Sequence, residues 1–397
     1  SDSARLQEVQ AATSYRGQQV ERYLIVRKIA GHRRHVAIYL ATDSVAKERA
    51  VREVAIKTLS GGTVHERAML HQEYLMLRQA NHPNCVRGLA FFDRAEDDQC
   101  HLVMEYIRGG DMFDYVTRRR GLHETEARVY FAQMAAVCVY LHAHNIAHRD
   151  LKLENFMLQP HEGADRGAEY TVKLVDFGFA NRRRAHEMHE TACGTPQYAA
   201  PEILTRLPNS TDRYNGMLCD AWALGVCLYA MLTSTFPWEG ETLPQCLRNA
   251  AAGNYTPLDA AQYSADVRAL VGALLQVEVH KRMQTWEIAT HAWLTGSADE
   301  REEESEKGGE TTTKTDMHAL LCDVLCTELN FDRQTLVNAL RRRESIEHVA
   351  YKSRERLIYE RRQAENQHAL ARTRSADAQP TRDTSRAEDA VRRVQTT

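Results

Sequence analysis

The chain has 397 residues, which at ~100–200 residues per domain gives room for two or three folded units. Its hydrophobic content of 43% is enough for a substantial core, and its net charge of −3 points to no nucleic-acid or membrane partner. No apolar run reaches the ~18 residues that a membrane span needs, and the N-terminus lacks a hydrophobic signal core. Nine cysteines without CxxC pairs argue against a disulfide framework. We therefore expect a reducing, intracellular compartment such as the cytoplasm.

The first residues, 1–19, are polar, and we expect them to be flexible. The next segment, residues 20–105, holds short runs that are rich in β-branched or aromatic side chains and bounded by polar turns. These strand-like runs are YLIVRKI, HVAIYLATD, EVAIKTL and CHLVMEY. One helical stretch interrupts them, with apolar residues at helical spacing, namely Met69, Leu70, Tyr74, Leu75 and Leu77. The pattern predicts a small β-rich lobe over residues 20–105.

Residues 106–295 have a mostly helical pattern. A long amphipathic helix is predicted from ETEARVYFAQMAAVCVYLHAHN, and a deeply buried one from CDAWALGVCLYAML, which is apolar nearly all round. A strand-rich lobe followed by a larger helical lobe predicts an α+β, two-lobed fold with a cleft between the lobes.

The composition changes after residue 295. Residues 296–315 are acidic and nearly devoid of apolar side chains, so they are predicted to be a linker. Helical periodicity returns over residues 316–362, which predicts a small domain of three short helices. Residues 363–397 are polar and lack a core pattern, and we expect a disordered tail.

Four motifs occur along the predicted lobes in a fixed order. They are VAIK ending at Lys57, HRDLKLEN over 148–155, DFG over 176–178 and APE over 200–202. Each is weak alone, but together and in order they are highly specific. Over residues 20–295 the chain resembles a eukaryotic protein kinase, and the HRDLK form of the loop resembles the serine/threonine kinases. The resemblance implies ATP and Mg²⁺ as cofactors and proteins as substrates.

Phosphoryl transfer gives these motif residues their expected roles. Lys57 would touch the α- and β-phosphates, oriented by an ion pair with Glu73 on the predicted helix of the small lobe. Asp150 would accept and orient the substrate hydroxyl, and Lys152 would contact the transferring phosphate. The hard oxygen ligands suited to Mg²⁺ would be Asn155 and Asp176. The alternative for Lys57 and Glu73 is a pair of ordinary surface charges.

The same resemblance implies a nucleotide pocket between the lobes. A hinge through residues 105–107 would meet adenine with its backbone groups, with Met104 at the back of the pocket. The nucleotide-binding residues expected from the resemblance are Gly31, Ile38, Ala55, Lys57, Met104, Glu105, Ile107, Met157 and Asp176.

Four further residues are expected to brace the larger lobe. Asp220 should tie down the backbone of the catalytic loop from the buried helix, and His148 should pack structurally. Glu202 and Arg282 should form a buried ion pair.

The segment HETACGTPQYAAPE suggests regulation. It places Thr191 where AMP-activated protein kinase and its relatives carry an activating phosphate. A phosphate on Thr191, added by an upstream kinase, could pair with Arg149 and with Arg182 or Arg183. The alternative is a solvated loop threonine.

Two further features refine the expected function. Asp111 and Glu154 are acidic at the expected substrate entrance, which favours basic residues upstream of the target serine or threonine. The helical segment 316–362 resembles the ubiquitin-associated-type domain that follows the catalytic domain in AMP-activated kinase relatives. That resemblance implies a regulatory role, and a generic helical hairpin is the alternative.

The stretch IAGHRRHVAIYL, residues 29–40, departs from the kinase pattern. Kinases carry GxGxxGxV here, because glycine lets backbone N–H groups approach the phosphates. Aligning Ile38 with the valine puts Gly31 at the first glycine and Arg33 and Val36 at the other two. We expect a bulkier cover with weaker or slower nucleotide binding. An active kinase remains the favoured hypothesis, and a pseudokinase scaffold is the alternative.

Overall fold

The computed structural model describes residues 17–33, 35–46, 53–94, 98–161, 170–182, 195–205, 214–289 and 291–295. All of them lie in the first of two compact units, residues 1–329. The expected linker, three-helix domain and tail, residues 296–397, lie outside the described residues, as does Thr191, the expected regulatory phosphosite.

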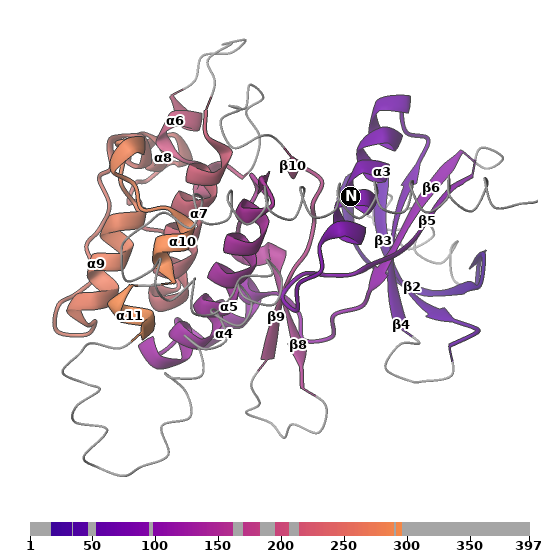
Figure 1. Cartoon of the computed structure of the whole chain (residues 1–397), viewed down its shortest axis with the longest axis horizontal. Helices are drawn as coiled ribbons and strands as arrows, with labels where there is room; N and C mark the ends of the chain where they lie inside the picture. The colour runs from indigo at the N-terminus through magenta and orange to yellow at the C-terminus, as the bar shows by residue number, and fades with distance from the viewer. Residues whose placement is uncertain are drawn as a thin grey trace, which may run out of the picture. The chain divides into compact units, whose positions relative to one another are not determined.

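The small lobe is a six-stranded sheet of order β1-β2-β3-β4-β6-β5, in which every paired strand is antiparallel (Figure 1). Its strands are β1 (Gln19–Val20), β2 (Tyr23–Arg33), β3 (Val36–Asp43), β4 (Glu53–Ser60), β5 (Gly88–Arg94) and β6 (Gln99–Glu105). Gly17 N donates to Ile25 O at 3.0 Å, next to the two-residue edge strand β1.

The register of the sheet sorts its side chains onto two faces. Ile38 pairs with Lys57 and Ala55 pairs with Met104, so these four side chains share one face. The opposite face has a core of its own, made by Val20, Tyr23, Ile25, Tyr39, Ala41, Val54, Ile56 and Val103. The first face is therefore the one on which the predicted nucleotide contacts gather.

Strand β5 has no counterpart among the predicted strands. Its sequence, GLAFFDR, is a continuous apolar run followed by polar residues rather than an alternating pattern. One side packs under a helix, where Tyr74 stacks on Phe91 at 5.7 Å between ring centroids. A strand covered in this way lacks the period-2 signal of a half-exposed strand.

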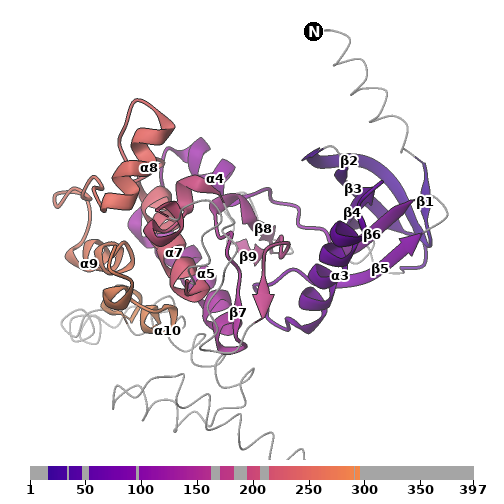
Figure 2. The same cartoon turned by 90° about the horizontal axis from the view of Figure 1, so that it is seen from above.

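The helix of the small lobe, α3 (Val64–Gln79), begins at a capping box. Thr63 Oγ1 accepts from Glu66 N, and the Glu66 carboxylate accepts from Thr63 N at 2.8 Å. In Figure 2 the helix lies along the sheet beside β5 and β6.

The inward face of α3 differs from the predicted apolar stripe. Its buried residues are Leu70, Glu73, Met76 and Leu77, whereas Met69 and Leu75 are 40% and 37% exposed. The prediction was wrong for these two because a charged residue, Glu73, occupies an inward position. The apolar residues of the sequence therefore do not coincide fully with the buried face of α3.

The large lobe is mainly helical, as predicted for residues 106–295. Its helices are α4 (Met112–Arg119), α5 (Glu124–Ala143), α6 (Pro201–Leu204), α7 (Gly216–Thr233), α8 (Leu243–Ala252), α9 (Ala265–Leu274), α10 (Thr285–Ile288) and α11 (Ala292–Thr295). Two of these, α5 and α7, fill the core and pack against each other. Within the described residues only α7 is long and apolar enough to cross a membrane, and it is mostly buried in the lobe.

Short strands and turns bring the loops of the large lobe to the small one. Strands β8 (Phe156–Pro160) and β9 (Tyr170–Leu174) form a ladder, and β7 (Ile146–Ala147) pairs with β10 (Asn181–Arg182). Backbone bonds join β9 to the segment after α3, because Val86 N donates to Leu174 O and Leu174 N to Asn84 O. The lobes therefore meet beside the loop that follows β9.

Candidate active site

Three charged groups meet where the two lobes join. Strand β4 presents Lys57, α3 presents Glu73, and the loop after β9 presents Asp176. Lys57 Nζ donates to both carboxylate oxygens of Glu73, at 2.9 and 2.8 Å, and to Asp176 Oδ1 at 2.9 Å. The predicted pairing of Lys57 with Glu73 is formed, so the surface-charge alternative does not hold.

The electrostatics of this cluster favour the charged forms of Lys57 and Asp176, whereas burial raises the pKa of Glu73. Burial alone would lower the pKa of Lys57, but Glu73 and Asp176 outweigh burial and raise it well above its usual value. Burial would likewise raise the pKa of Asp176, yet the neighbouring Lys57 holds it at about 2. Lys57 is therefore a fixed positive charge, and Asp176 a fixed negative one, at neutral pH.

Local backbone geometry sets the position of Asp176. Its φ of 59° lies in the left-handed region, which is uncommon for a residue other than glycine. Gly178 follows closely: a Cβ there would lie 3.2 Å from Asp176 Oδ1 and 3.7 Å from Glu73 Oε2. A larger residue at 178 would crowd the charged cluster, which explains the glycine of the DFG motif in this fold.

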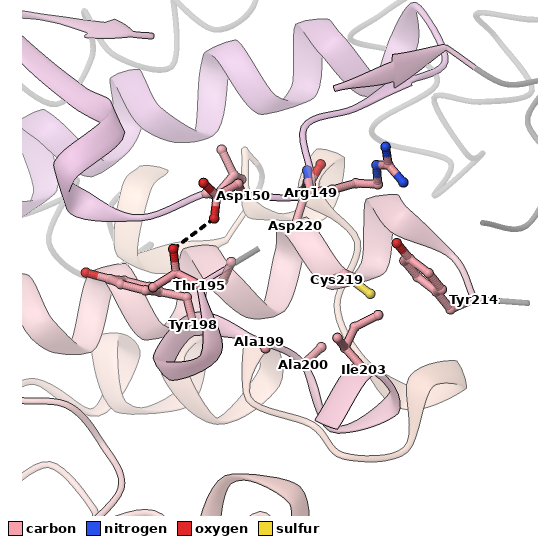
Figure 3. Close-up of a pocket in the computed structure, with 12 residues that line it drawn as sticks. Arg149, Asp150, Thr195, Tyr198, Ala199, Ala200, Ile203, Tyr214, Cys219 and Asp220 are labelled. Atoms are coloured by element: carbon pink, nitrogen blue, oxygen red, sulfur yellow. Dashed lines mark hydrogen bonds between the residues drawn. The ribbon is translucent and has the colours of Figure 1, made fainter. Parts of the chain in front are cut away.

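A second polar cluster surrounds the predicted catalytic carboxylate, Asp150, which is buried (Figure 3). Lys152 Nζ donates to Asp150 Oδ2 at 2.8 Å, and Thr195 Oγ1 donates to Asp150 Oδ1 at 3.0 Å. Lys152 Nζ also reaches Thr195 Oγ1 at 2.9 Å, which closes the triangle. Sequence reasoning missed Thr195, although it stands in the quoted segment that contains Thr191.

The same close-up shows a pocket that borders Asp150 (Figure 3). It is lined from the catalytic loop, from the segment that includes Thr195 and from α7. The lining residues are Arg149, Asp150, Leu151, Thr195, Tyr198, Ala199, Ala200, Ile203, Tyr214, Cys219, Asp220 and Ala223.

Asp220 fixes the backbone of the catalytic loop, as predicted. Its carboxylate accepts from His148 N and from Arg149 N, both at 2.8 Å, and lies 2.9 Å from His142 Nε2. His148 is buried and its ring meets Phe177 edge-on at 5.1 Å, which confirms the packing role expected for it. Asp220 therefore fixes the backbone of the loop that carries the Asp150 carboxylate.

Asn155 and Asp176 offer oxygen atoms that could bind a divalent cation. Val175 N donates to Asn155 O at 2.9 Å, so the segments that carry Asn155 and Asp176 lie side by side. The Nδ2 atom of Asn155 donates to Asp150 O at 2.8 Å, so the Oδ1 atom of Asn155 is the one that could bind a cation. Lys57 and Gly178 both approach Oδ1 of Asp176, leaving Oδ2 for a cation. Two hard oxygens suit Mg²⁺.

The predicted nucleotide contacts fall on both sides of the hinge. Ala55 and Met104 are buried side by side on the face that also carries Ile38 and Lys57. From the large lobe, Met157 bridges to Asp111 just beyond the hinge. The predicted hinge residue Ile107 is buried.

The hinge residue Glu105 directs its side chain away from that face. It pairs with Val54, one residue out of phase with the Ala55–Met104 pair. Its carboxylate accepts from Lys173 Nζ at 3.0 Å and from Arg87 N at 3.1 Å. Glu105 could therefore meet a nucleotide only through its backbone, which is the contact predicted for the hinge.

Strands β2 and β3 pair with each other over the described part of the glycine-poor stretch. The β2–β3 ladder runs on to the pair Arg33–Val36, with register shifts on either side of Ala30. Gly31 has a φ of 118°, and a Cβ there would lie 2.6 Å from both Ala37 Cα and Val36 O. The single retained glycine thus occupies a place where the facing strand leaves no room for a Cβ.

The expected brace of the large lobe is present. Arg282 Nη1 and Nη2 donate to the two oxygens of Glu202 at 2.7 and 2.9 Å, and Arg282 is buried.

The guanidinium of Arg149 contacts a backbone carbonyl. It donates to Phe179 O, at 2.8 Å from Nε and 2.5 Å from Nη2.

Comparisons with known proteins agree with this arrangement. Residues 41–294 match the family model for a protein kinase domain. The probable serine/threonine-protein kinase MARK-C of Dictyostelium discoideum is 33% identical over 68% of this chain and 33% of its own. The human NUAK family SNF1-like kinase 1 is 33% identical over 61% and 34%. The Arabidopsis thaliana SNF1-related protein kinase catalytic subunit alpha KIN12 is 31% identical over 67% and 50%. The chain thus spans a third to a half of each relative.

Proposed function

Because the chain belongs to the protein kinase domain family, with relatives among the AMP-activated kinase-related serine/threonine kinases, we propose that it transfers the γ-phosphate of ATP to protein serine and threonine hydroxyls. The observation that carries this proposal is the ion pair between Lys57 and Glu73, joined to Asp176. This support is chemical: the fixed positive charge of Lys57 could bind the phosphates of a nucleotide held at the hinge.

The small lobe would bind and orient the nucleotide. Ile38, Ala55 and Met104 supply an apolar surface for the adenine ring, and the hinge backbone supplies its hydrogen bonds. Lys57 Nζ would hold the α- and β-phosphates, and Glu73 keeps that amine pointed into the site.

The catalytic loop would orient the attacking hydroxyl. Lys152 and Thr195 hold both oxygens of Asp150 in fixed positions, so the carboxylate is aimed before a substrate arrives. A serine or threonine hydroxyl would donate to Asp150, and Lys152 would move to the transferring phosphate. Mg²⁺, held by Asn155 and Asp176, would neutralise charge on the phosphates.

The decisive experiment is turnover of Mg-ATP on a basic peptide by the wild type and by Asp150→Asn. We expect phosphate transfer by the wild type and a loss of about 10²-fold or more in the variant, in line with the typical contribution of a positioned acid or base. Nucleotide binding without turnover by the wild type, with Thr191 phosphorylated, would favour the pseudokinase alternative instead. The observation behind that alternative is the loss of two of the three glycines in the stretch 29–40.

Activation through phosphorylated Thr191 is part of this proposal. Its support is Arg149, whose guanidinium contacts a carbonyl, that of Phe179, among the described residues. A phosphate would offer that guanidinium a stronger, charged partner. Thr191→Ala should lose most of the activity. Phosphatase treatment should inactivate the wild type and leave the residual activity of Thr191→Ala unchanged. Full activity of Thr191→Ala would contradict this part of the proposal.

The proposed substrates carry basic residues before the target hydroxyl. Glu154 supports this, because Tyr198 O–H donates to its carboxylate at 3.0 Å and holds it beside the catalytic loop. Asp111 caps α4 by accepting from Asp114 N at 2.8 Å. We expect Glu154→Gln to raise KM for a peptide with upstream arginines and to leave KM for an alanine-substituted peptide unchanged. Equal KM values for both peptides in the wild type would argue against basic substrates.

Regulation by the segment after residue 295 completes the proposal. The resemblance of residues 316–362 to a ubiquitin-associated-type domain is its support. Truncation after residue 300 should change kcat with the same peptide, and unchanged kinetics would count against a regulatory role.

A further inference from the structure

Helix α3 carries Glu73, and its two parts are held in different ways. The C-terminal part, from His71 on, packs closely on β5: a Cβ on Gly88 would lie 2.9 Å from Leu77 Cβ, and the Phe91 ring meets those of Tyr74 and His71. The N-terminal part, residues 64–70, lies before these contacts. What holds it decides how well Glu73 faces Lys57.

Arg67 provides that hold. It stands three residues before the buried Leu70 and six before Glu73, on the inward side of the helix. Its Nη1 donates to Asp93 Oδ1 at 2.6 Å and to Cys100 Sγ at 3.2 Å, and its Nη2 forms an ion pair with Asp98.

These partners come from both strands of the β5–β6 hairpin. Asp93 lies in β5, Cys100 lies in β6, and the two are joined because Cys100 Sγ donates to Asp93 Oδ1 at 3.1 Å. We call Arg67, Asp93, Asp98 and Cys100 the α3 clasp. Burial, with the neighbouring Asp93, raises the pKa of the Cys100 thiol to about 11, so the thiol keeps the proton that it donates.

The clasp is also tied to the segment that leads into the helix. Asp98 has a φ of 54°, and its carbonyl accepts from Gly61 N at 2.9 Å, just before the cap of α3. Aspartate adopts this conformation more readily than most residues. The bond from Gly61 therefore ties the backbone that presents the Asp98 carboxylate to the segment before α3.

The exposures within the clasp indicate a specific contact rather than a chance surface pair. The Arg67 side chain is 17% exposed, whereas those of Asp93 and Asp98 are 54% and 68% exposed. The Arg67 side chain is thus mostly covered, and carboxylates lie on two sides of its guanidinium. Two acceptors also suit the planar fork of arginine better than a lysine ammonium.

We propose that Arg67 is a positioning residue for phosphoryl transfer, acting through the α3 clasp to hold Glu73 against Lys57. The inference rests on the proposed kinase function and deepens it. It does not make Arg67 a catalytic residue, because Arg67 contacts the hairpin and not the reacting groups. Releasing the clasp should let the N-terminal part of α3 swing from the sheet and loosen the Glu73–Lys57 ion pair.

The first test is a double-mutant cycle on activity, with Arg67→Met and Glu73→Gln. We expect Arg67→Met to lower kcat/KM for Mg-ATP about tenfold in the wild-type background. It should have no further effect in the Glu73→Gln background, where the ion pair to be positioned is already lost. Asp93→Asn should reproduce the effect of Arg67→Met. The matched control is Arg78→Met, an exposed arginine in the last turn of the same helix, which should leave kcat/KM unchanged.

A merely structural role of Arg67 would give another result. The substitution would then lower the thermal midpoint, and it would reduce the activity by the same factor in both backgrounds. Equal losses with and without Glu73, or no loss at all, would overturn the proposal.

A second measurement keeps this test separate from the proposed function. Lys57 is acetylated with an amine-reactive ester, and the modified fraction is measured by mass spectrometry. Releasing Lys57 from Glu73 should increase its labelling, so Arg67→Met should raise it at least twofold and Arg78→Met should not. A wild type without turnover would contradict the kinase function, yet this increase would still support the clasp. Unchanged labelling in Arg67→Met would overturn the clasp whether or not the chain is active.

Discussion

Lys57 and Glu73 form a two-pronged ion pair between a strand and a helix, with Lys57 Nζ 2.9 Å from Oε1 and 2.8 Å from Oε2. The pair is buried on the helix side and joins Asp176 on the large lobe. One amine therefore connects the small-lobe sheet, α3 and the loop after β9. A nucleotide phosphate arriving at Lys57 would find the amine already oriented, so little ordering would remain for the binding step.

The first prediction concerns this pair. Glu73→Gln should lower kcat by about a hundredfold, because a misplacement of about 1 Å in a positioned group can cost that much. Turnover of Mg-ATP on a basic peptide measures it. Glu66→Gln, at an exposed carboxylate on the same helix, is the control and should keep its activity, because glutamine can also close the capping box. A Glu73→Gln enzyme with wild-type kcat would mean that the amine needs no carboxylate to orient it.

Some contacts of the candidate active site, such as the Lys57–Glu73 pair, were predictable because motif and backbone coincide there. Lys57 and Asp150 stand within short segments whose spacing is fixed by one strand or one loop, so their neighbours in sequence are also neighbours in space. Thr195 differs: its contact with Asp150 depends on the path of a segment that has no periodic signal. The α3 clasp was missed for a similar reason, since Arg67 meets partners on two strands, one of them not predicted at all.

Helix α3 shows where pattern reasoning fails in physical terms. The apolar residues Met69 and Leu75 face outward, and the charged Glu73 faces inward. A hydrophobic pattern assumes that burial follows polarity. It errs where the ion pair with Lys57 stabilises a buried carboxylate, which is the feature that the proposed function needs.

The second prediction concerns Gly31 in the glycine-poor stretch. Gly31→Ala should destabilise the domain by about 1–3 kcal/mol, because it adds backbone strain and a Cβ 2.6 Å from Ala37 Cα. Gly110→Ala is the control: its φ of 80° is also positive and adds backbone strain, but no atom lies within 4 Å of the added Cβ. Urea unfolding should therefore show the larger loss for Gly31→Ala, and equal losses would mean that the clash relaxes freely.

The third prediction uses the ion pair of Glu202 and Arg282. Removing either partner alone, by Glu202→Gln or Arg282→Met, should cost about 3–5 kcal/mol of unfolding free energy, because the other charge is left buried. The double variant should cost less than the sum of the single losses, since no unpaired charge remains. Urea unfolding of all four proteins measures the cycle. Additivity within about 0.5 kcal/mol would show that the two charges do not interact.

The fourth prediction is a pH dependence that arises from Glu124 at the start of α5. Its carboxylate accepts from Ser264 Oγ at 2.5 Å, from Ser264 N at 3.0 Å and from Trp293 Nε1 at 2.7 Å. Burial would raise the pKa of Glu124, but the bonds from Ser264 and Trp293, with nearby Arg128, outweigh burial and lower it. The folded state therefore favours the ionised form.

The sign of the effect follows from that lowered pKa. Glu124 contributes stability above its unfolded pKa of about 4.3, and the contribution is lost as pH falls through the lower folded pKa. Glu124→Gln should therefore cost about 1–3 kcal/mol at pH 7, and its difference from the wild type should shrink below about pH 4. Urea unfolding across pH 3–7 measures this, with Glu241→Gln at an exposed position as the control. Parallel stability curves for Glu124→Gln and the wild type would show that the three donors do not favour the ionised carboxylate.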